Sequence, residues 1–140
     1  MPVKMSAEDL TEFMARAFPQ VNEDFIIDAV GEMTLRLRMP IAHKHLRPGG
    51  TVSGPSMFAL ADCAIYLAVL AMIGPQALAV TTNCSLDFMR KPAADRDLVA
   101  ECKLLKLGRV LAVGDVLIYS DGVAGPVARA SMTYSIPPQR

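Results

Sequence analysis

The chain has 140 residues, of which 52% are hydrophobic, and its 14 basic and 14 acidic side chains cancel to a formal net charge of zero. A chain of this length falls within the usual size of one domain and has enough apolar residues for a substantial core. No basic block stands out, which argues against DNA or RNA as a partner. The three cysteines lack paired or metal-type spacing, so we expect free thiols. The N-terminal stretch is acidic where a signal peptide would be apolar, and we therefore expect a cytoplasmic protein.

A short amphipathic helix is predicted over residues 6–18. Ser6 is a good N-cap residue, two acids follow it, and apolar residues recur at helical spacing up to Pro19. Residues 33–39 then alternate between apolar and polar side chains, which is typical of a half-buried strand. We expect this strand to pair with segment 25–28 as a hairpin.

A long apolar run with a single acid follows a glycine-rich loop. The only formal charge between Pro48 and Leu86 is Asp62. A central helix is predicted over residues 56–73, because serine and proline suit the segment that opens it and Gly74 can end it. The run is a little short for a bilayer and carries a central acid, so we interpret it as a core helix and expect no membrane partner.

Four runs with strand character follow this helix, at residues 77–89, 98–107, 109–119 and 126–136. Consecutive strands joined by short turns imply an antiparallel sheet, and one long apolar helix implies that the sheet curls around it. We therefore predict an α+β fold in a single domain over residues 1–140. In the first run, period two predicts one buried face formed by Val80, Thr82, Cys84, Leu86 and Phe88.

Asp62 is the candidate functional residue. A carboxylate in a helix that should be buried costs several kcal/mol unless something compensates it. The hydroxyl of Thr81 or of Thr82 could hold it in the charged form. The alternative is an acid that is occupied by structural hydrogen bonds.

Two other polar groups near the helix start suggest no catalytic site of their own. Ser53 is better explained as an N-cap than as a nucleophile, because Ser-Gly-Pro lacks the strand-elbow context of a serine hydrolase. His43 and His45 have no nearby acid or cysteine to complete a ligand set, so we expect no metal site.

The order of strand, glycine-rich loop, buried helix with one acid and several long strands resembles the hotdog fold. More narrowly, the chain from about Met33 onwards resembles the acyl-CoA thioesterases of the phenylacetate-pathway type. The family's asparagine, His-Gly-Gly and helical aspartate stretch is matched by residues 47–62, and its strand from a hydroxyl residue to an aromatic and a proline by residues 81–92. Gly108 and Arg109 resemble its Gly-Arg turn, and residues 121–134 resemble its final hairpin.

This resemblance implies hydrolysis of acyl- or aroyl-CoA thioesters without a cofactor, since coenzyme A is part of the substrate. It assigns the Gly54 backbone N–H to polarise the thioester carbonyl and Asp62 to act as base or nucleophile, and it favours Thr81 as the partner of Asp62. The chain departs from the family where Arg47, Ser53 and Pro55 replace its asparagine, histidine and second glycine. Coenzyme A phosphates could be bound by four cationic side chains, those of Arg47, Arg90, Lys91 and Arg109. The alternative for each of them is a solvated charge at the end of a strand. In full, the residues that we expect at the substrate are His45, Arg47, Ser53, Pro55, Tyr66, Thr82, Arg90, Lys91 and Arg109.

Gly54 and Asp62 are too far apart on one helix to act on the same carbonyl, because a rise of about 1.5 Å per residue separates them by roughly 12 Å. Two such helices, antiparallel across a two-fold axis, would bring Gly54 of one protomer to Asp62 of the other. The resemblance also implies sheets paired edge to edge, so we expect a homodimer or a homotetramer built from two dimers. Two alternatives remain open: a non-catalytic acyl-thioester binding protein and a hotdog hydratase or dehydratase, although the predicted helix lacks the histidine that the latter would use.

Overall fold

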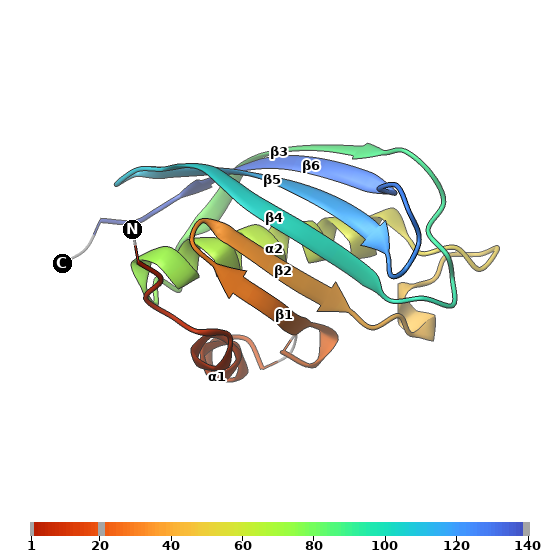
Figure 1. Cartoon of the computed structure of the whole chain (residues 1–140), viewed down its shortest axis with the longest axis horizontal. Helices are drawn as coiled ribbons and strands as arrows, with labels where there is room; N and C mark the ends of the chain where they lie inside the picture. Colours follow the sequence, from red (N-terminus) through yellow and green to blue (C-terminus); the bar gives the residue numbers. More distant parts are fainter. Residues whose placement is uncertain (1, 20–21, 139–140) are drawn as a thin grey trace.

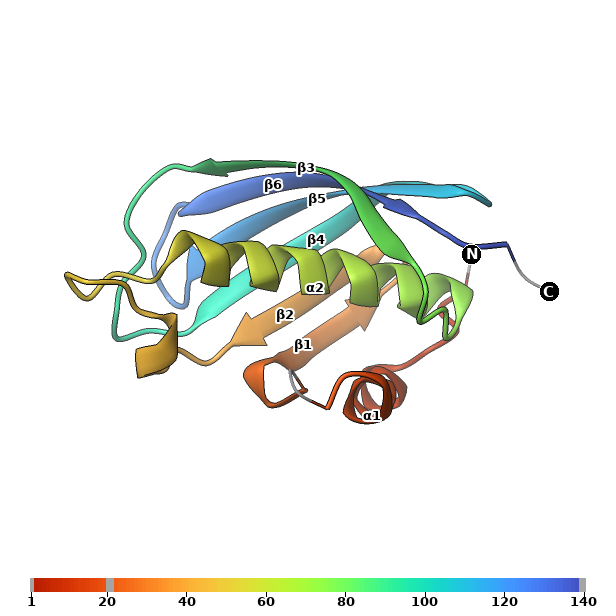
Figure 2. The same cartoon turned by 180° about the vertical axis from the view of Figure 1, so that it is seen from behind.

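The computed structural model describes residues 2–19 and 22–138, and within them six antiparallel strands form one sheet in the order β1-β2-β4-β5-β6-β3. The long helix α2 (Gly54–Ile73) lies across the concave face of this sheet, and the shorter α1 (Ala7–Ala17) packs beside β1 and α2 (Figures 1 and 2). The predicted α+β fold with a curled sheet around a central helix is confirmed. The strands are β1 (Ile26–Gly31), β2 (Thr34–Met39), β3 (Val80–Phe88), β4 (Leu98–Leu107), β5 (Leu111–Ser120) and β6 (Ala128–Ser135).

Helix α2 begins two residues before the predicted start. Ser53 is the N-cap, since its Oγ accepts a hydrogen bond from the backbone N–H of Ser56 at 3.2 Å. Pro55 fits the first turn, because its fixed φ is already helical and its missing N–H would have no acceptor there. The helix is long and apolar enough to cross a bilayer by length and composition alone, but most of it is buried inside the protein. It is therefore the core helix that the sequence predicts.

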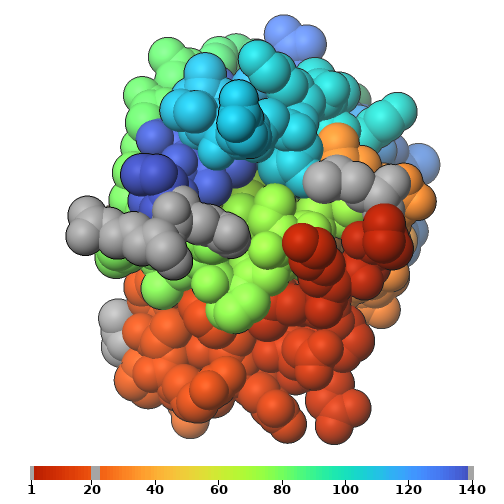
Figure 3. Space-filling model, turned by 90° about the vertical axis from the view of Figure 1, so that its left-hand side faces the viewer, coloured from red at the N-terminus to blue at the C-terminus, as the bar shows by residue number. Residues whose placement is uncertain are grey.

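Helix α1 is capped within its own first turn and packs against both β1 and α2. Ser6 and Asp9 form a reciprocal capping box, with hydrogen bonds of 3.0 and 3.1 Å between each side chain and the other residue's backbone N–H. Leu10 and Phe13 bury their side chains in the core. Seen from the end of the molecule where α2 stops, the surface of α2 lies between the α1–β1 layer and the later strands (Figure 3). Helix α1 extends to within one residue of each end that the sequence predicts for it.

Strand β3 departs from the prediction. It is an edge strand paired only with β6, and among the five residues predicted to form its buried face only Leu86 is even partly buried. The prediction of one uninterrupted alternation along β3 is wrong because the strand contains a β-bulge. The bulge lies between Thr81, which pairs with Tyr134, and Asn83, which pairs with Thr133. The extra residue reverses the direction in which side chains point on either side of it.

Candidate active site

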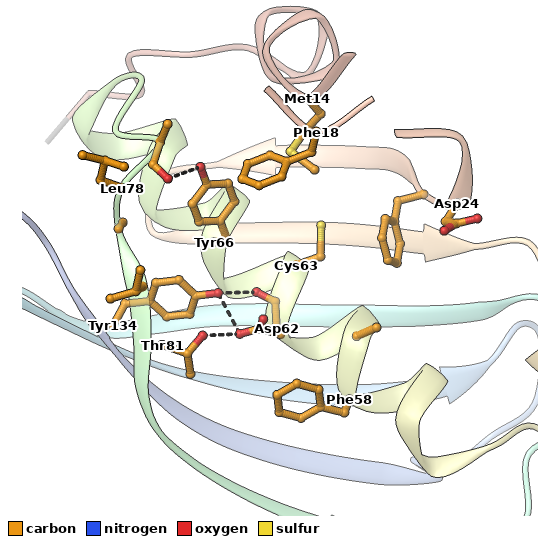
Figure 4. Close-up of a pocket in the computed structure, with 15 residues that line it drawn as sticks. Met14, Phe18, Asp24, Phe58, Asp62, Cys63, Tyr66, Leu78, Thr81 and Tyr134 are labelled. Atoms are coloured by element: carbon orange, nitrogen blue, oxygen red, sulfur yellow. Dashed lines mark hydrogen bonds between the residues drawn. The ribbon is translucent and has the colours of Figure 1, made fainter. Parts of the chain in front are cut away.

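Asp62 projects from α2 toward two hydroxyl groups on neighbouring strands (Figure 4). Thr81 Oγ1 on β3 donates a hydrogen bond to Asp62 Oδ1 at 2.5 Å. Tyr134 Oη on β6 lies 2.7 Å from the same Oδ1 and 3.0 Å from the backbone oxygen of Asp62, and donates to both. Thr81 and Tyr134 reach one atom because they are paired across β3 and β6. In the described part of the chain, both hydrogen bonds to this carboxylate end on Oδ1, which leaves Oδ2 available.

The neighbours of Asp62 remain uncharged. Burial and the nearby Asp62 charge raise the pKa of Tyr134 well above its usual range, so its hydroxyl keeps the proton that it donates. Burial also raises the pKa of the adjacent Cys63 thiol to about 12. The Thr81 and Tyr134 hydroxyls therefore serve Asp62 as hydrogen-bond donors.

The β3 bulge decides which threonine contacts Asp62. Thr81 is half-buried and points to the helix, whereas Thr82 is exposed and its hydroxyl donates to the backbone oxygen of Thr133 at 3.3 Å. Of the two threonines that the sequence left open, Thr81 makes the contact that the family resemblance favours. Thr82 makes no contact with Asp62.

A cavity of about 580 Å³ opens beside the Asp62 carboxylate. One stripe of α2 at helical spacing forms its floor, from Phe58 through Asp62 to Tyr66. Tyr66, predicted to lie near the substrate, lines this cavity, and its hydroxyl donates to the backbone oxygen of Ala77 at 3.2 Å. The other lining residues are Met14, Phe18, Asp24, Phe25, Ala59, Cys63, Ala77, Leu78, Ala79, Val80, Thr81 and Tyr134.

Gly54 begins α2 at the other end of β3. Its backbone N–H lies in the first helical turn, where no acceptor exists within the helix. A Cβ at Gly54 would be 3.2 Å from the ring of Phe88, the last residue of β3. The hydrogen bonds of Ser53 Oγ go to the backbone N–H and the hydroxyl of Ser56, as an N-cap requires. One chain therefore does not bring Gly54 and Asp62 together, since an unbroken helix separates them.

His45 and Pro55 line a second, smaller pocket of about 260 Å³ beside the start of α2. The His45 side chain is buried, and its Nδ1 accepts a hydrogen bond from the backbone N–H of Ala42 at 2.9 Å. Burial, followed by the charge of Lys44, lowers the pKa of His45, so the ring is neutral with its proton on Nε2. Neither His45 nor Pro55 lines the Asp62 cavity.

The four candidate phosphate-binding cations are exposed, and they lie at two ends of the fold. Arg47 is in the loop before α2, and Arg90 and Lys91 follow β3 at the end where Gly54 lies. Arg109 lies in the turn between β4 and β5, at the opposite end of the sheet, because β5 starts beside Ser135. One chain does not gather these cations at a single phosphate site.

Tyr134 is the functional candidate that sequence reasoning missed. Its place on the buried face of a cleanly alternating strand was visible, and a buried tyrosine hydroxyl usually requires a hydrogen-bond partner. What was missing was the strand order, which places β6 beside β3 and under Asp62. The contribution of α1 to the cavity, through Met14 and Phe18, also had no local signal.

Comparison with known proteins identifies the family of the chain. The model of the thioesterase superfamily matches residues 49–126, more than half of the chain. The chain belongs to the thioesterase superfamily. A protein from Silicibacter sp. that is provisionally named a thioesterase is 55% identical, with a TM-score of 0.92 over 99% of this chain and 96% of that one. The resemblance to hotdog thioesterases is thereby confirmed.

Two further solved structures share the fold. A mutant of the phenylacetic acid degradation protein PaaI from Thermus thermophilus is 26% identical, with a TM-score of 0.74 over 85% of this chain and 99% of that one. Zebrafish thioesterase superfamily member 2 is 16% identical, with a TM-score of 0.84 over 96% of this chain and 100% of that one, a likeness of fold alone. Among curated proteins, none matches the sequence.

Proposed function

We propose that this protein hydrolyses the thioester bond of acyl- or aroyl-coenzyme A, with Asp62 as general base or nucleophile. The observation that carries the proposal is a carboxylate beside an apolar cavity, held by the hydroxyls of Thr81 and Tyr134. Membership of the thioesterase superfamily supports the same reaction class. In this proposal the reaction uses no cofactor, because coenzyme A is part of the substrate.

Thioester hydrolysis needs an attacking oxygen and a donor for the carbonyl oxygen as it gains negative charge. With Asp62 as base, Oδ2 takes a proton from water while the water oxygen bonds to the thioester carbon. The tetrahedral intermediate then collapses, the C–S bond breaks, and the departing sulfur takes up a proton. With Asp62 as nucleophile, Oδ2 bonds to the thioester carbon, the C–S bond breaks and the thiolate leaves and is protonated. Water then hydrolyses the resulting mixed anhydride, which releases the acid and regenerates the Asp62 carboxylate. In both cases Thr81 and Tyr134 fix the carboxylate through Oδ1.

The donor in this proposal is the Gly54 N–H of a partner protomer. Asp62 follows Gly54 by eight positions on the helix, a separation of roughly 12 Å, which is too far for both to act on one carbonyl group. An isologous dimer would generate two equivalent sites, each with Asp62 from one chain and Gly54 from the other.

The free edge of β3 supports this dimer. Exposed edges and apolar side chains are features through which sheets associate. If two β3 strands pair antiparallel about a two-fold axis, the Thr81 end of one lies beside the Phe88 end of the other. Since Gly54 contacts Phe88 and Asp62 contacts Thr81, this pairing would bring Gly54 of one protomer toward Asp62 of its partner. The large apolar side chains exposed at this edge are Leu78 (75%), Val80 (56%) and Phe88 (55%).

The same pairing would also bring cations together. Arg90 and Lys91 of one protomer would lie near the end of the sheet that carries Arg109 of the other. Guanidinium groups form strong forked contacts with phosphates, so this end is our candidate for the nucleotide part of coenzyme A. A further pairing of two dimers into a tetramer belongs to the same proposal.

The first test is thiol release from short, medium, long and aromatic acyl-CoAs by wild type and by Asp62→Asn. We expect the variant to lose about a hundredfold or more in kcat, the range for losing a general base. Asp115→Asn is the matched control, because Asp115 is an exposed carboxylate on β5, away from the β3 edge, and does not line the cavity. It should keep near wild-type activity.

Other outcomes would contradict the proposal in distinguishable ways. Equal turnover by wild type and folded Asp62→Asn would remove Asp62 from the mechanism. Tight binding of acyl-CoA without turnover would identify a binding protein. Hydration of an enoyl-CoA with the thioester left intact would identify a hydratase.

A further inference from the structure

Helix α1 provides one wall of the cavity that opens beside Asp62. The carboxylate cluster lies at one end of this cavity, and Met14 and Phe18 lie at the α1 end (Figure 4). Side chains from segments far apart in the sequence line these two ends, and the packing of α1 against α2 brings the segments together.

Aromatic rings connect these two ends. The ring of Tyr66 lies between those of Tyr134 and Phe18, with centroid distances of 6.1 Å to Tyr134 and 5.7 Å to Phe18. The Phe18 and Tyr66 rings meet edge to face, at an interplanar angle of 88°. An acyl group whose thioester lies at Asp62 would therefore extend along the rings of Tyr134 and Tyr66 before it reaches α1.

Polar groups along this path already have partners. The Tyr66 hydroxyl donates to the Ala77 backbone oxygen, and the Asp24 carboxylate is paired with Lys44. Burial keeps the Cys63 thiol protonated, with a pKa of about 12. A negatively charged acyl group would thus lose its hydration here without meeting a free donor, since the Tyr66 hydroxyl already donates to Ala77 and the Asp24 carboxylate only accepts.

We propose that this cavity binds the acyl part of the substrate, that the acyl group is an aliphatic chain or aryl group without a negative charge, and that Phe18, the C-cap residue of α1, limits its length. This inference rests on the proposed thioester hydrolysis, since it is the position of Asp62 that decides which end the thioester occupies. Phe18 suits this role because α1 is docked by other residues. Leu10 and Phe13 anchor the helix, and the capping box closes its first turn.

The test compares two phenylalanines on the same helix. Phe18→Ala enlarges the far end of the cavity, whereas Phe13→Ala removes a buried ring that does not line it. The readout is the ratio of kcat/KM for dodecanoyl-CoA to that for hexanoyl-CoA, with phenylacetyl-CoA and succinyl-CoA as aromatic and charged substrates.

We expect Phe18→Ala to raise this ratio at least about tenfold, the lower end of what apolar contacts in a binding pocket provide. Phe18→Trp should lower it. Phe13→Ala should reduce the unfolding temperature and leave the ratio unchanged. Succinyl-CoA should be at least about tenfold poorer than hexanoyl-CoA, because its carboxylate is desolvated in the cavity.

An unchanged ratio in Phe18→Ala and Phe18→Trp would overturn the inference, as would an equal change in Phe13→Ala or efficient use of succinyl-CoA. If no thioester is hydrolysed, the proposed function fails. Binding measured by calorimetry then tests separately whether the cavity holds the acyl group. Tighter binding of phenylacetyl-CoA than of free coenzyme A, altered by Phe18→Ala but not by Phe13→Ala, would support the cavity. Equal binding of the two ligands would overturn it.

Discussion

Two regions of α2 carry the candidate chemistry, and they are completed in different ways. At Asp62, one chain supplies both donors to the carboxylate, from β3 and β6. At Gly54, the N–H of the first helical turn lies at the far end of the helix segment from Asp62, and its close neighbour is the ring of Phe88. Under the proposed mechanism each chain would therefore carry two half-sites, because a rigid helix keeps its own two groups roughly 12 Å apart.

The largest effect is expected in a subunit complementation experiment, which tests whether Gly54 of one chain and Asp62 of the other act together. Gly54→Pro removes the amide N–H, and the extended backbone of Ser53 (φ −72°, ψ 151°) is compatible with a proline after it. We expect Gly54→Pro and Asp62→Asn homodimers to be nearly inactive. A heterodimer of the two variants, purified through two different tags, should recover about half of the wild-type rate, because one of its two sites is intact.

Two observations would contradict this prediction. A heterodimer as inactive as both parents would show that the half-sites do not combine across chains. Full activity of Gly54→Pro alone would remove its N–H from the mechanism. Gly54→Ala is the control for crowding against Phe88, because it keeps the N–H while adding a methyl group.

The next largest effect should come from the donors to Asp62. Tyr134→Phe removes only the hydroxyl, and we expect kcat to fall roughly tenfold to a hundredfold, the equivalent of one hydrogen bond to a charged group. KM should stay within about twofold if Tyr134 positions the carboxylate without binding substrate. Thr81→Val should act similarly, and Thr81→Ser should restore activity.

Thr82→Val is the matched control for this pair of variants, because Thr82 bonds to the backbone of Thr133 instead of Asp62. A loss in Thr82→Val equal to that in Thr81→Val would contradict the assignment. Circular dichroism and thermal unfolding of each variant would separate a loss of activity from a loss of fold.

A smaller effect is expected at the end of the sheet that carries Arg109. If this arginine binds the nucleotide part of coenzyme A, Arg109→Ala should raise KM roughly threefold to tenfold for a coenzyme A thioester. KM for the matching N-acetylcysteamine thioester, which lacks the nucleotide, should not change. Arg129→Ala, an exposed arginine paired with Asp87, is the control. An equal change with both thioesters would exclude phosphate binding by Arg109.

The smallest effect that we expect is on the free energy of unfolding, through the ion pairs of Arg38 on β2. Arg38 lies 2.8 Å from Asp121 and also pairs with Asp28 and Asp97, and it lowers the pKa of Asp121 below its usual 3.8. A carboxylate with a lowered pKa in the folded state stabilises the protein above its unfolded-state pKa, and this stability is lost as pH falls toward the folded-state pKa.

Urea unfolding of wild type and Asp121→Asn checks this sign. Wild type should be slightly more stable at pH 7, and the difference should shrink below pH 3.8. Asp95→Asn, another acid in a nearby loop, controls for the loss of one negative charge. A difference that grows on acidification would contradict the linkage, and specific activity should be unchanged because Asp121 does not line the Asp62 cavity.

Much of the fold could be predicted from local pattern. The capping residues Ser6 and Ser53, the alternation in β2 and β6 and the unbroken apolar run of α2 all predicted the observed element type. Strand β3 was the exception, because its bulge reverses the alternation between Thr81 and Asn83. A bulge depends on the pairing register with the neighbouring strand, so the sequence of one strand does not predict it.

The sequence by itself determined the fold class and singled out Asp62, because a lone carboxylate in an apolar helix is costly and therefore conspicuous. Tertiary structure alone decided that Tyr134 joins Thr81 on Oδ1 and that α1 walls the cavity. The physical reason is that hydrophobic periodicity reports which side of an element is buried, whereas contacts between elements depend on strand order and helix docking. Those contacts bring residues 18, 66 and 134 together from three segments distant in the chain.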